Sequence, residues 1–301
     1  MGRIIAFIAA LACFSAGIAS AQLTPQDTPI RPEKIRENLY VFFGAGGNIA
    51  VLIGPEGVLI VDDQFTEMTA KIEAAVRLLT PKPIKFVINT HWHYDHTGGN
   101  ENLGSEGKVI IAQENTRKRL LQGGNVMGVQ IAPTAPTGLP VITFAESSTV
   151  HFNGQTIEMT HLPAGHTDTD ALIVFKEANV IHTGDSYTHP TFPFVDPDSG
   201  GTLRGMIAAR KQTLALCNAD CVIIPGHGPL SNAADLKASI AMLEEMDKRV
   251  TKAVAAKKSL ADFLASNPTA DFDKTYAPRP DQGKVFVTRA YEERVKASGK
   301  K

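Results

Sequence analysis

Residues 90–100 read Thr-His-Trp-His-Tyr-Asp-His-Thr-Gly-Gly-Asn, and they follow the apolar run Ile84–Ile88, which predicts a buried strand. In an extended loop alternate side chains face the same way, so His91 and His93 can share one target. Asp95 and His96 come after a bend, where they can face a second ion. Imidazole and carboxylate are zinc ligands, whereas a closed structural zinc site favours thiolates. The stretch therefore predicts a catalytic metal site with an open coordination position.

Three further candidate ligands lie later in the chain, each at the end of a predicted strand. His166 lies in Pro163-Ala-Gly-His-Thr167, Asp185 in Thr183-Gly-Asp185, and His227 in Pro225-Gly-His-Gly-Pro229. Glycine has no Cβ, so loops of this kind can crowd around one point. The alternative is a surface histidine cluster that binds metal adventitiously, but it leaves these matching pieces unexplained.

The motifs H-x-H-x-D-H, G-H, G-D and P-G-H-G, in this order, resemble those of the metallo-β-lactamase-fold superfamily over residues 37–247. The resemblance implies an α/β fold, a four-layer αββα sandwich with the site at one edge between two sheets. It also implies two zinc ions per chain, with other divalent metals as the alternative. The first would be held by His91, His93 and His166, the second by Asp95, His96 and His227, and Asp185 would bridge them.

The resemblance also implies the chemistry of the site. A water shared by two zinc ions loses a proton near neutral pH, so hydroxide becomes available as the nucleophile. Asp95 is expected to be catalytic, orienting that hydroxide, as well as a ligand. Asp62 or Asp63 is expected to hydrogen-bond a ligand histidine, and the sequence does not choose between them. Candidate residues of the substrate pocket, with packing or an ordinary loop as the alternative, are Trp92, Met127 and His189.

The substrate is less well defined, because one fold can carry many reactions. The favoured reaction is hydrolysis of a small cyclic amide or ester, with a β-lactam as the leading named substrate because an exported enzyme would meet one. However, zinc β-lactamases resembling this chain usually carry Cys or Ser in place of Asp185. They also often place a lysine soon afterwards, which Ser186-Tyr-Thr-His-Pro190 lacks. The alternatives are a lactonase or thioesterase and, from another class, a catalytically inactive zinc-binding protein.

The remaining hydrophobic pattern predicts alternating strands and helices in one domain over residues 22–301. Strands are expected at residues 38–44, 48–53, 57–61, 84–88, 109–112, 141–144, 155–161, 171–175, 180–183 and 221–224. Helices are expected at residues 67–79, 114–121, 200–216, 233–255, 260–265 and 284–295. Residues 122–140 are rich in Gly and Pro, which predicts an irregular segment.

The N-terminus predicts export to the periplasm or medium. Arg3, the apolar run Ile4–Ile18 and Ala19-Ser20-Ala21 have the pattern of a signal peptide over residues 1–21, whose cleavage leaves no membrane anchor. Lys and Arg number 30 and Asp and Glu 31, and no basic cluster suggests a nucleic-acid partner. The expected partner is a small-molecule substrate, and the oligomeric state is undefined. Cys217 and Cys221 remain after cleavage, as a disulfide or as two buried thiols.

Overall fold

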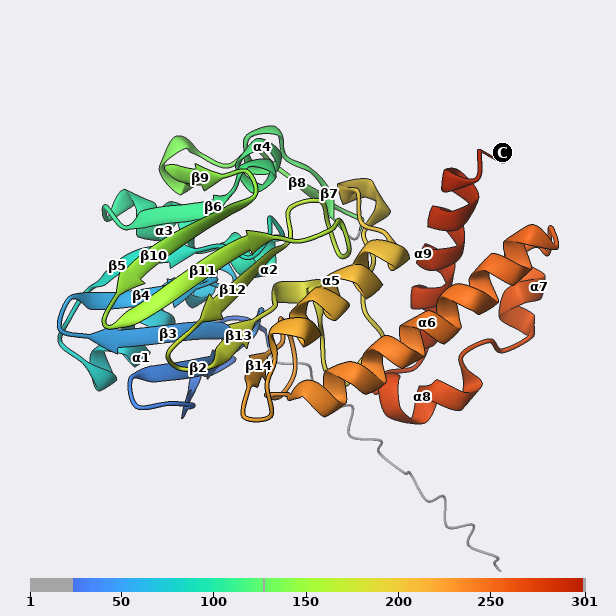
Figure 1. The fold of residues 1–301 in the computed structure, drawn as a ribbon. Coiled ribbons are helices and arrows are strands. Elements are labelled where there is room, and N and C mark those ends of the chain that lie inside the picture. The colour runs from blue at the N-terminus through green and yellow to red at the C-terminus, as the bar shows by residue number, and fades with distance from the viewer. Residues whose placement is uncertain (1–23, 127, 300–301) are drawn as a thin grey trace, which may run out of the picture.

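Two β-sheets packed face to face organise the computed structural model, which describes residues 24–126 and 128–299 (Figure 1). The larger, seven-stranded sheet has the order β1 (Arg31–Lys34), β2 (Leu39–Phe43), β3 (Ile49–Gly54), β4 (Gly57–Val61), β5 (Ile84–Ile88), β6 (Val109–Gln113) and β9 (Ile142–Phe144). The smaller, five-stranded sheet has the order β10 (Ser147–Phe152), β11 (Gln155–His161), β12 (Ala171–Phe175), β13 (Val180–His182) and β14 (Val222–Ile224). The expected signal peptide and Met127 lie outside the described residues.

Apolar side chains from both sheets form the core between them. Leu52 and Leu59 of the larger sheet belong to the same buried cluster as Ile157 and Ile173 of the smaller one. All five residues of β4 are buried, as expected for a strand that is covered on both faces. The near-continuous apolar runs in the sequence therefore correspond to central strands.

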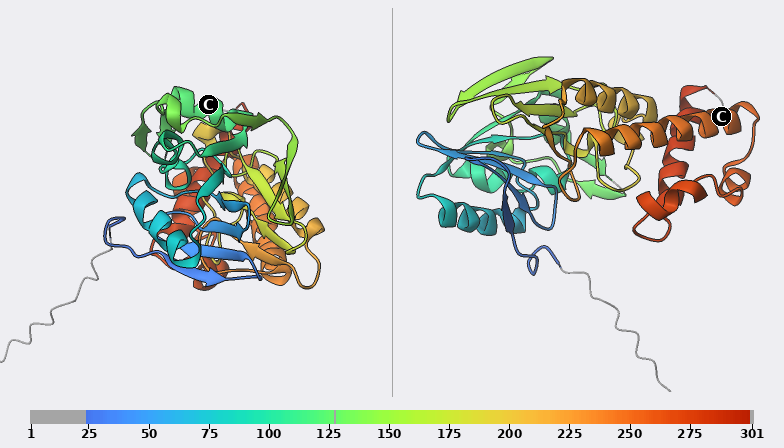
Figure 2. Two further views of the ribbon diagram at one scale, coloured as in Figure 1. Left: turned by 90° about the vertical axis from the view of Figure 1, so that its left-hand side faces the viewer. Right: turned by 60° about the horizontal axis from the view of Figure 1, so that its bottom comes forward.

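Helices cover the outer face of each sheet, so the layers run αββα (Figures 1 and 2). Ile72 and Val76 of one helix pack against the outer face of the larger sheet, and Ala209 and Ile240 of two others pack against the smaller sheet. The predicted four-layer α/β sandwich is confirmed. The α-helices are α1 (Thr69–Leu79), α2 (Tyr94–Thr97), α3 (Asn100–Ser105), α4 (Glu114–Gln122), α5 (Leu203–Leu216), α6 (Ala233–Ala255), α7 (Leu260–Ala265), α8 (Ala270–Tyr276) and α9 (Gln282–Ala297).

Parallel strands determine where the loops meet. β4, β5 and β6 run parallel in the larger sheet, and β13 and β14 run parallel in the smaller one. Loops at the carboxyl ends of parallel strands emerge at the same edge of a sheet. Asp62 follows β4, the His91 loop follows β5, Asp185 follows β13 and His227 follows β14. The topology thus delivers loops from both sheets to one edge of the sandwich.

The elements differ from the sequence prediction in a few places. Residues 122–140, expected to be irregular, contain the antiparallel strands β7 (Gly124–Val126) and β8 (Val129–Ile131). Three-residue strands among Gly and Pro are too short to show a hydrophobic period. The strands β1 and β10 and the helices α2, α3 and α8 were not expected, since both strands are mostly polar and the helices are only 4, 6 and 7 residues long.

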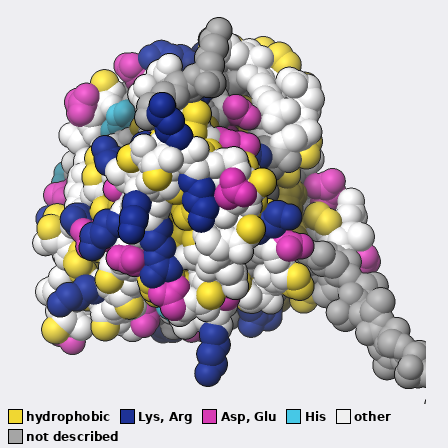
Figure 3. Space-filling model, turned by 90° about the vertical axis from the view of Figure 1, so that its right-hand side faces the viewer, with side chains coloured by type: hydrophobic (Ala, Val, Ile, Leu, Met, Phe, Trp, Pro, Cys, Tyr) yellow, Lys and Arg dark blue, Asp and Glu magenta, His cyan; other side chains and the backbone are white. Residues whose placement is uncertain are grey.

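Helices α7, α8 and α9 pack around the C-terminal half of α6, beyond the sandwich (Figure 2). Their apolar cluster includes Val250, Phe263 and Phe286. Lysine and arginine side chains lie among acidic ones on the face that these helices present (Figure 3).

No helix in residues 24–126 or 128–299 is long and apolar enough to cross a membrane. The single domain over residues 22–301 stays a prediction.

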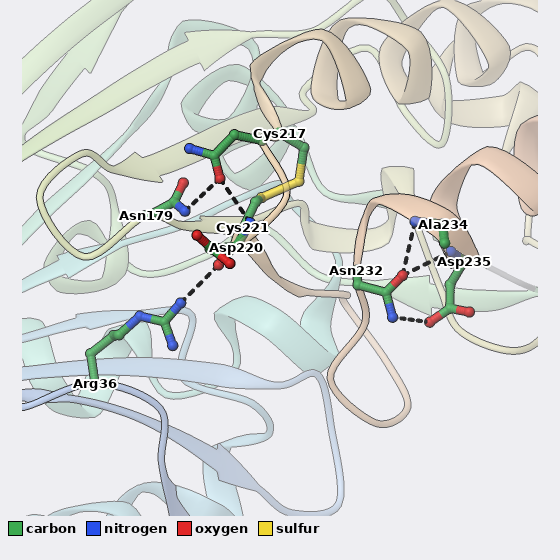
Figure 4. Close-up of a disulfide and its surroundings, with 9 residues drawn as sticks. Arg36, Asn179, Cys217, Asp220, Cys221, Asn232, Ala234 and Asp235 are labelled. Atoms are coloured by element: carbon green, nitrogen blue, oxygen red, sulfur yellow. Dashed lines mark hydrogen bonds between the residues drawn. A yellow bond between two sulfur atoms is a disulfide. The ribbon is translucent and has the colours of Figure 1, made fainter.

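A disulfide joins Cys217 and Cys221, whose Cα atoms lie 5.3 Å apart between α5 and β14 (Figure 4). Of the two alternatives that the sequence leaves open, the structure has the bonded pair. Arg36 holds the enclosed loop, because its guanidinium donates to the carbonyl of Asp220 over 3.0 Å and to that of Ala178 over 2.9 Å. The link therefore ties the end of α5 to the start of the last strand.

Replacing both cysteines by serine is expected to lower the free energy of unfolding by about 2 kcal/mol, because the bond closes a short loop in the unfolded chain. Urea unfolding of the oxidised wild type and of C217S/C221S measures the difference. Two free thiols in the denatured, unreduced wild type, or equal unfolding free energies, would contradict the bonded pair.

Candidate metal centre

Seven side chains expected to be metal ligands converge at one edge of the sandwich. Their ligand atoms form three overlapping groups, and within each group all atoms lie within 4.8 Å of one another. The structure thus brings together every member of the expected ligand set. The three groups are His91, His93 and His166; His91, His96 and Asp185; and Asp95, His96 and His227.

The three-histidine group, His91 with His93 and His166, is almost closed to solvent. Each of these residues is at most 2% exposed. Nδ1 of His93 lies 2.9 Å from Nε2 of His166, and Nε2 of His91 is buried without a hydrogen-bond partner among the described residues. Burial lowers the pKa of His91 well below its usual range, and the neighbouring imidazoles lower it further. These rings therefore present nitrogen atoms to one point, an arrangement that suits a cation.

The mixed group, Asp95 with His96 and His227, adds carboxylate to imidazole. Nε2 of His227 lies 3.2 Å from Nε2 of His96 and 3.2 Å from Oδ2 of Asp95. Asp185 faces both groups, because Oδ1 lies 3.3 Å from Nε2 of His96 and Oδ2 lies 3.7 Å from Nε2 of His166. Burial would raise the pKa of Asp185, but His227 and His96 outweigh it and hold that pKa well below its usual range. The ionised carboxylate between the groups is placed as a bridging ligand would be.

Several features of this cluster fit bound metal. Oδ1 of Asp185 is buried without a hydrogen-bond partner in the described part of the chain, as is Nε2 of His91, and an unpaired buried polar atom is costly. Two glycines leave the space that the ligands need. A Cβ on Gly47 would lie 2.1 Å from Cε1 of His96, and a Cβ on Gly226 would lie 1.9 Å from Oδ1 of Asp185. The donor set of nitrogen and oxygen atoms, without thiolate, is one that zinc accepts in catalytic sites.

Asp62, rather than Asp63, supports a candidate ligand. Oδ2 of Asp62 lies 2.7 Å from Nδ1 of His96, and the same carboxylate accepts hydrogen bonds from the backbone N–H and the hydroxyl of Thr90. Asp63 instead accepts a hydrogen bond from the backbone N–H of Gly99 over 2.9 Å. The Asp62 contact leaves Nε2 of His96 facing Asp95 and His227. A neutral imidazole that donates through Nδ1 has its lone pair on Nε2, where it can bind a metal ion.

Two further supporting groups come from a loop that the sequence analysis did not single out. Nε2 of His93 lies 3.0 Å from Oδ2 of Asp196, and Nδ1 of His166 lies 2.7 Å from the carbonyl oxygen of Phe194. Burial raises the pKa of Asp196, but hydrogen bonds from His93 and Ser199 outweigh it and lower the pKa to about 2. An aspartate among Pro and Gly ordinarily indicates a turn, so the pattern offered no signal of this role.

Of the candidate pocket residues, Trp92 and His189 do not line the groove described below. Trp92 is 2% exposed, and its indole N–H donates to the hydroxyl of Ser199 over 3.0 Å, so it is a packing residue rather than a pocket wall. The ring of His189 contacts the Tyr187 hydroxyl at 2.9 Å and lies toward Asp235 of α6. Met127 lies outside the described residues.

A groove of about 610 Å³ opens beside the mixed group. His227 is the most exposed of the seven candidate ligands at 37% of its side chain, followed by Asp95 at 22% and Asp185 at 10%. Access to the cluster is therefore from the side of the mixed group. The groove is lined by Arg31, Glu33, Phe43, Gly44, Ala45, Gly46, Asn48, His227, Gly228, Pro229 and Leu230.

The change Asp62→Asn is expected to weaken metal binding by about 10- to 100-fold, since a group that orients a ligand contributes that much. Asp63→Asn is the matched control. Burial raises the pKa of Asp63 well above its usual range, so an amide resembles its neutral carboxyl group. Competition with a chromophoric chelator measures zinc affinity in both variants. Equal zinc affinities in the two variants would contradict the assignment of Asp62.

Curated relatives share part of this chain. A linear primary-alkylsulfatase of Pseudomonas sp. is 25% identical over 230 residues, covering 64% of this chain and 43% of that protein. A hydroxyacylglutathione hydrolase of Polaromonas sp. is 28% identical over 170 residues, covering 56% of each chain. The chain thus spans about half the length of these relatives.

Solved structures and a family model agree on the fold. A metallo-beta-lactamase from Pontibacter korlensis superposes with a TM-score of 0.61 at 18% identity, covering 71% of this chain and 99% of that one. The DIM-1 metallo-beta-lactamase gives a TM-score of 0.60 at 19% identity, covering 72% and 97%. The family model described as metallo-beta-lactamase superfamily matches residues 43–245. The chain belongs to the metallo-beta-lactamase superfamily.

Proposed function

We propose that this protein is an exported zinc-dependent hydrolase that holds two zinc ions and cleaves a small ester or cyclic amide. The observation that carries the proposal is the position of Asp185. Its two carboxylate oxygens face separate groups of ligand atoms, at 3.3 Å from Nε2 of His96 and 3.7 Å from Nε2 of His166. A carboxylate shared between two sets of nitrogen and oxygen donors supports a two-metal site over a one-metal site.

The chain's own side chains would bind the two ions and orient the attacking water. His91, His93 and His166 would hold one ion, the mixed group would hold the other, and Asp185 would contact both. Zinc at this cluster would supply an activated water as nucleophile and would polarise the bond under attack. Oδ2 of Asp95 lies 3.2 Å from Nε2 of His227, which lines the groove. His96 and His227 outweigh burial and lower the pKa of Asp95, so it is ionised and can accept a hydrogen bond from the attacking water.

The groove indicates what kind of substrate can reach the cluster. Its lining combines apolar residues, Phe43 and Leu230 among them, with one cation and one anion, Arg31 and Glu33. A small substrate with both polar and apolar parts fits this mixed lining better than a highly charged polymer. The names of the curated relatives specify an alkyl sulfate and a hydroxyacylglutathione as their substrates. Those names, together with aspartate at position 185, favour an ester-type substrate over a β-lactam, the leading named substrate from the sequence.

The competing proposal is a zinc-binding protein without catalysis. Such a protein needs the metal ligands, but it does not need a path by which a substrate can reach them. Here the most exposed ligand, His227, lines the groove, so a substrate can approach the cluster from solvent. That access favours catalysis.

Export rests on two features that are independent of the site. Residues 1–21 have the pattern of a signal peptide. The disulfide between Cys217 and Cys221 supports an oxidising compartment, because such bonds are rare in the cytosol.

Purified mature protein is expected to contain two zinc ions and to hydrolyse at least one member of a panel of a lactone, a thioester, an aryl sulfate and nitrocefin, with loss of activity in chelator. Asp185→Asn is expected to reduce kcat/KM by more than about 100-fold, since a bridging ligand contributes more than an outer hydrogen bond. Asp262→Asn, a similar change on the distant helix α7, is the control. Two tightly held zinc ions with no turnover of any substrate would favour the non-catalytic protein.

A further inference from the structure

The loop from Phe192 to Gly201, here the support loop, contacts the three-histidine group at several points. The carbonyl oxygen of Phe194 accepts a hydrogen bond from Nδ1 of His166, and the carboxylate of Asp196 accepts one from Nε2 of His93. The backbone N–H of Asp196 also donates to the carbonyl of His166 over 3.0 Å. With these nitrogen atoms engaged, Nε2 of His166 and Nδ1 of His93 remain to face the cluster, 2.9 Å apart.

Asp196 is itself held in position. The hydroxyl of Ser199 donates to its Oδ2 over 2.6 Å, and that hydroxyl accepts a hydrogen bond from the indole N–H of Trp92 over 3.0 Å. The backbone N–H of Gly201 donates to the Asp196 carbonyl over 2.8 Å. Asp196 is 1% exposed and Ser199 is 0% exposed, so little water competes for these bonds.

The other end of the support loop is buried in the C-terminal helices. The backbone N–H of Phe192 donates to the carbonyl of Tyr276, at the end of α8, over 2.7 Å. The Phe192 ring stacks on Phe286 of α9 with centroids 5.2 Å apart and planes 17° apart. The guanidinium of Arg289, also on α9, lies 5.2 Å from the centroid of the Phe194 ring.

We propose that α8 and α9 fix the metal position at the three-histidine group. They hold the support loop, whose Phe194 carbonyl and Asp196 carboxylate orient His166 and His93. This inference rests on the proposed metal centre. The matched region of the family model ends at residue 245, so the two helices lie beyond it. The contribution is positional, since neither helix supplies one of the seven candidate ligands.

Asp196→Asn tests the contact with His93, with zinc as the probe. Occupancy of each position, from zinc anomalous scattering in crystals at limiting zinc, is combined with chelator competition in solution. We expect affinity at the three-histidine group to fall by about 10- to 100-fold and affinity at the mixed group to stay within about threefold. Ser199→Ala, which removes one hydrogen bond to Asp196, is expected to act in the same direction by a few-fold and replaces Asp196→Asn should that variant not fold.

Phe286→Leu tests the helices, with Phe263→Leu as the matched control. Both residues are buried in the same C-terminal cluster, but the aromatic partner of Phe263 is Tyr291 of α9 rather than the support loop. We expect similar losses of Tm, with weaker zinc binding at the three-histidine group only in Phe286→Leu. Equal zinc affinities in the two variants, or wild-type affinity in Asp196→Asn, would overturn the proposal. Wild-type protein that binds no zinc would instead overturn the proposed function.

Discussion

The convergence of imidazole and carboxylate groups at one buried edge is the constraint on which the rest of the structure depends. Burying polar groups without partners is costly, and Nε2 of His91 and Oδ1 of Asp185 have no hydrogen-bond partner among the described residues. Bound metal would satisfy both atoms at once. The two parallel strand sets bring the necessary loops to this edge, and glycines at positions 47 and 226 leave room for the ligand side chains.

Groups that hydrogen-bond the candidate ligands orient their imidazole rings toward the cluster. Asp62, which follows β4 of the larger sheet, contacts Nδ1 of His96. The support loop contacts Nε2 of His93 and Nδ1 of His166. That loop is in turn packed against α8 and α9 through Phe192. The C-terminal helices are therefore connected to the site, although in Figure 2 they extend away from the sandwich. These contacts come from helices beyond residue 245, where the match to the family model ends.

Most central strands could be predicted from the sequence, because continuous apolar runs are a local signal. The convergence of the seven candidate ligands could be predicted from motifs that resemble those of a known family, and their role as metal ligands stays a prediction. The choice between Asp62 and Asp63 could not be predicted. Asp62 has a φ of 66°, a left-handed conformation that the sequence does not specify, and this turn determines which carboxylate meets His96. Asp196 was missed because its partner, His93, is distant in sequence. The sequence left Trp92 open between pocket and packing, because its partner, Ser199, is also distant in sequence.

The proposed function requires that one edge of this sandwich hold two metal ions that share Asp185. A crystal structure of the mature protein grown with zinc, with anomalous data collected on both sides of the zinc absorption edge, tests it most directly. We expect two anomalous peaks, one among His91, His93 and His166 and one among Asp95, His96 and His227, with Asp185 contacting both. A single peak, or peaks away from these seven residues, would contradict it.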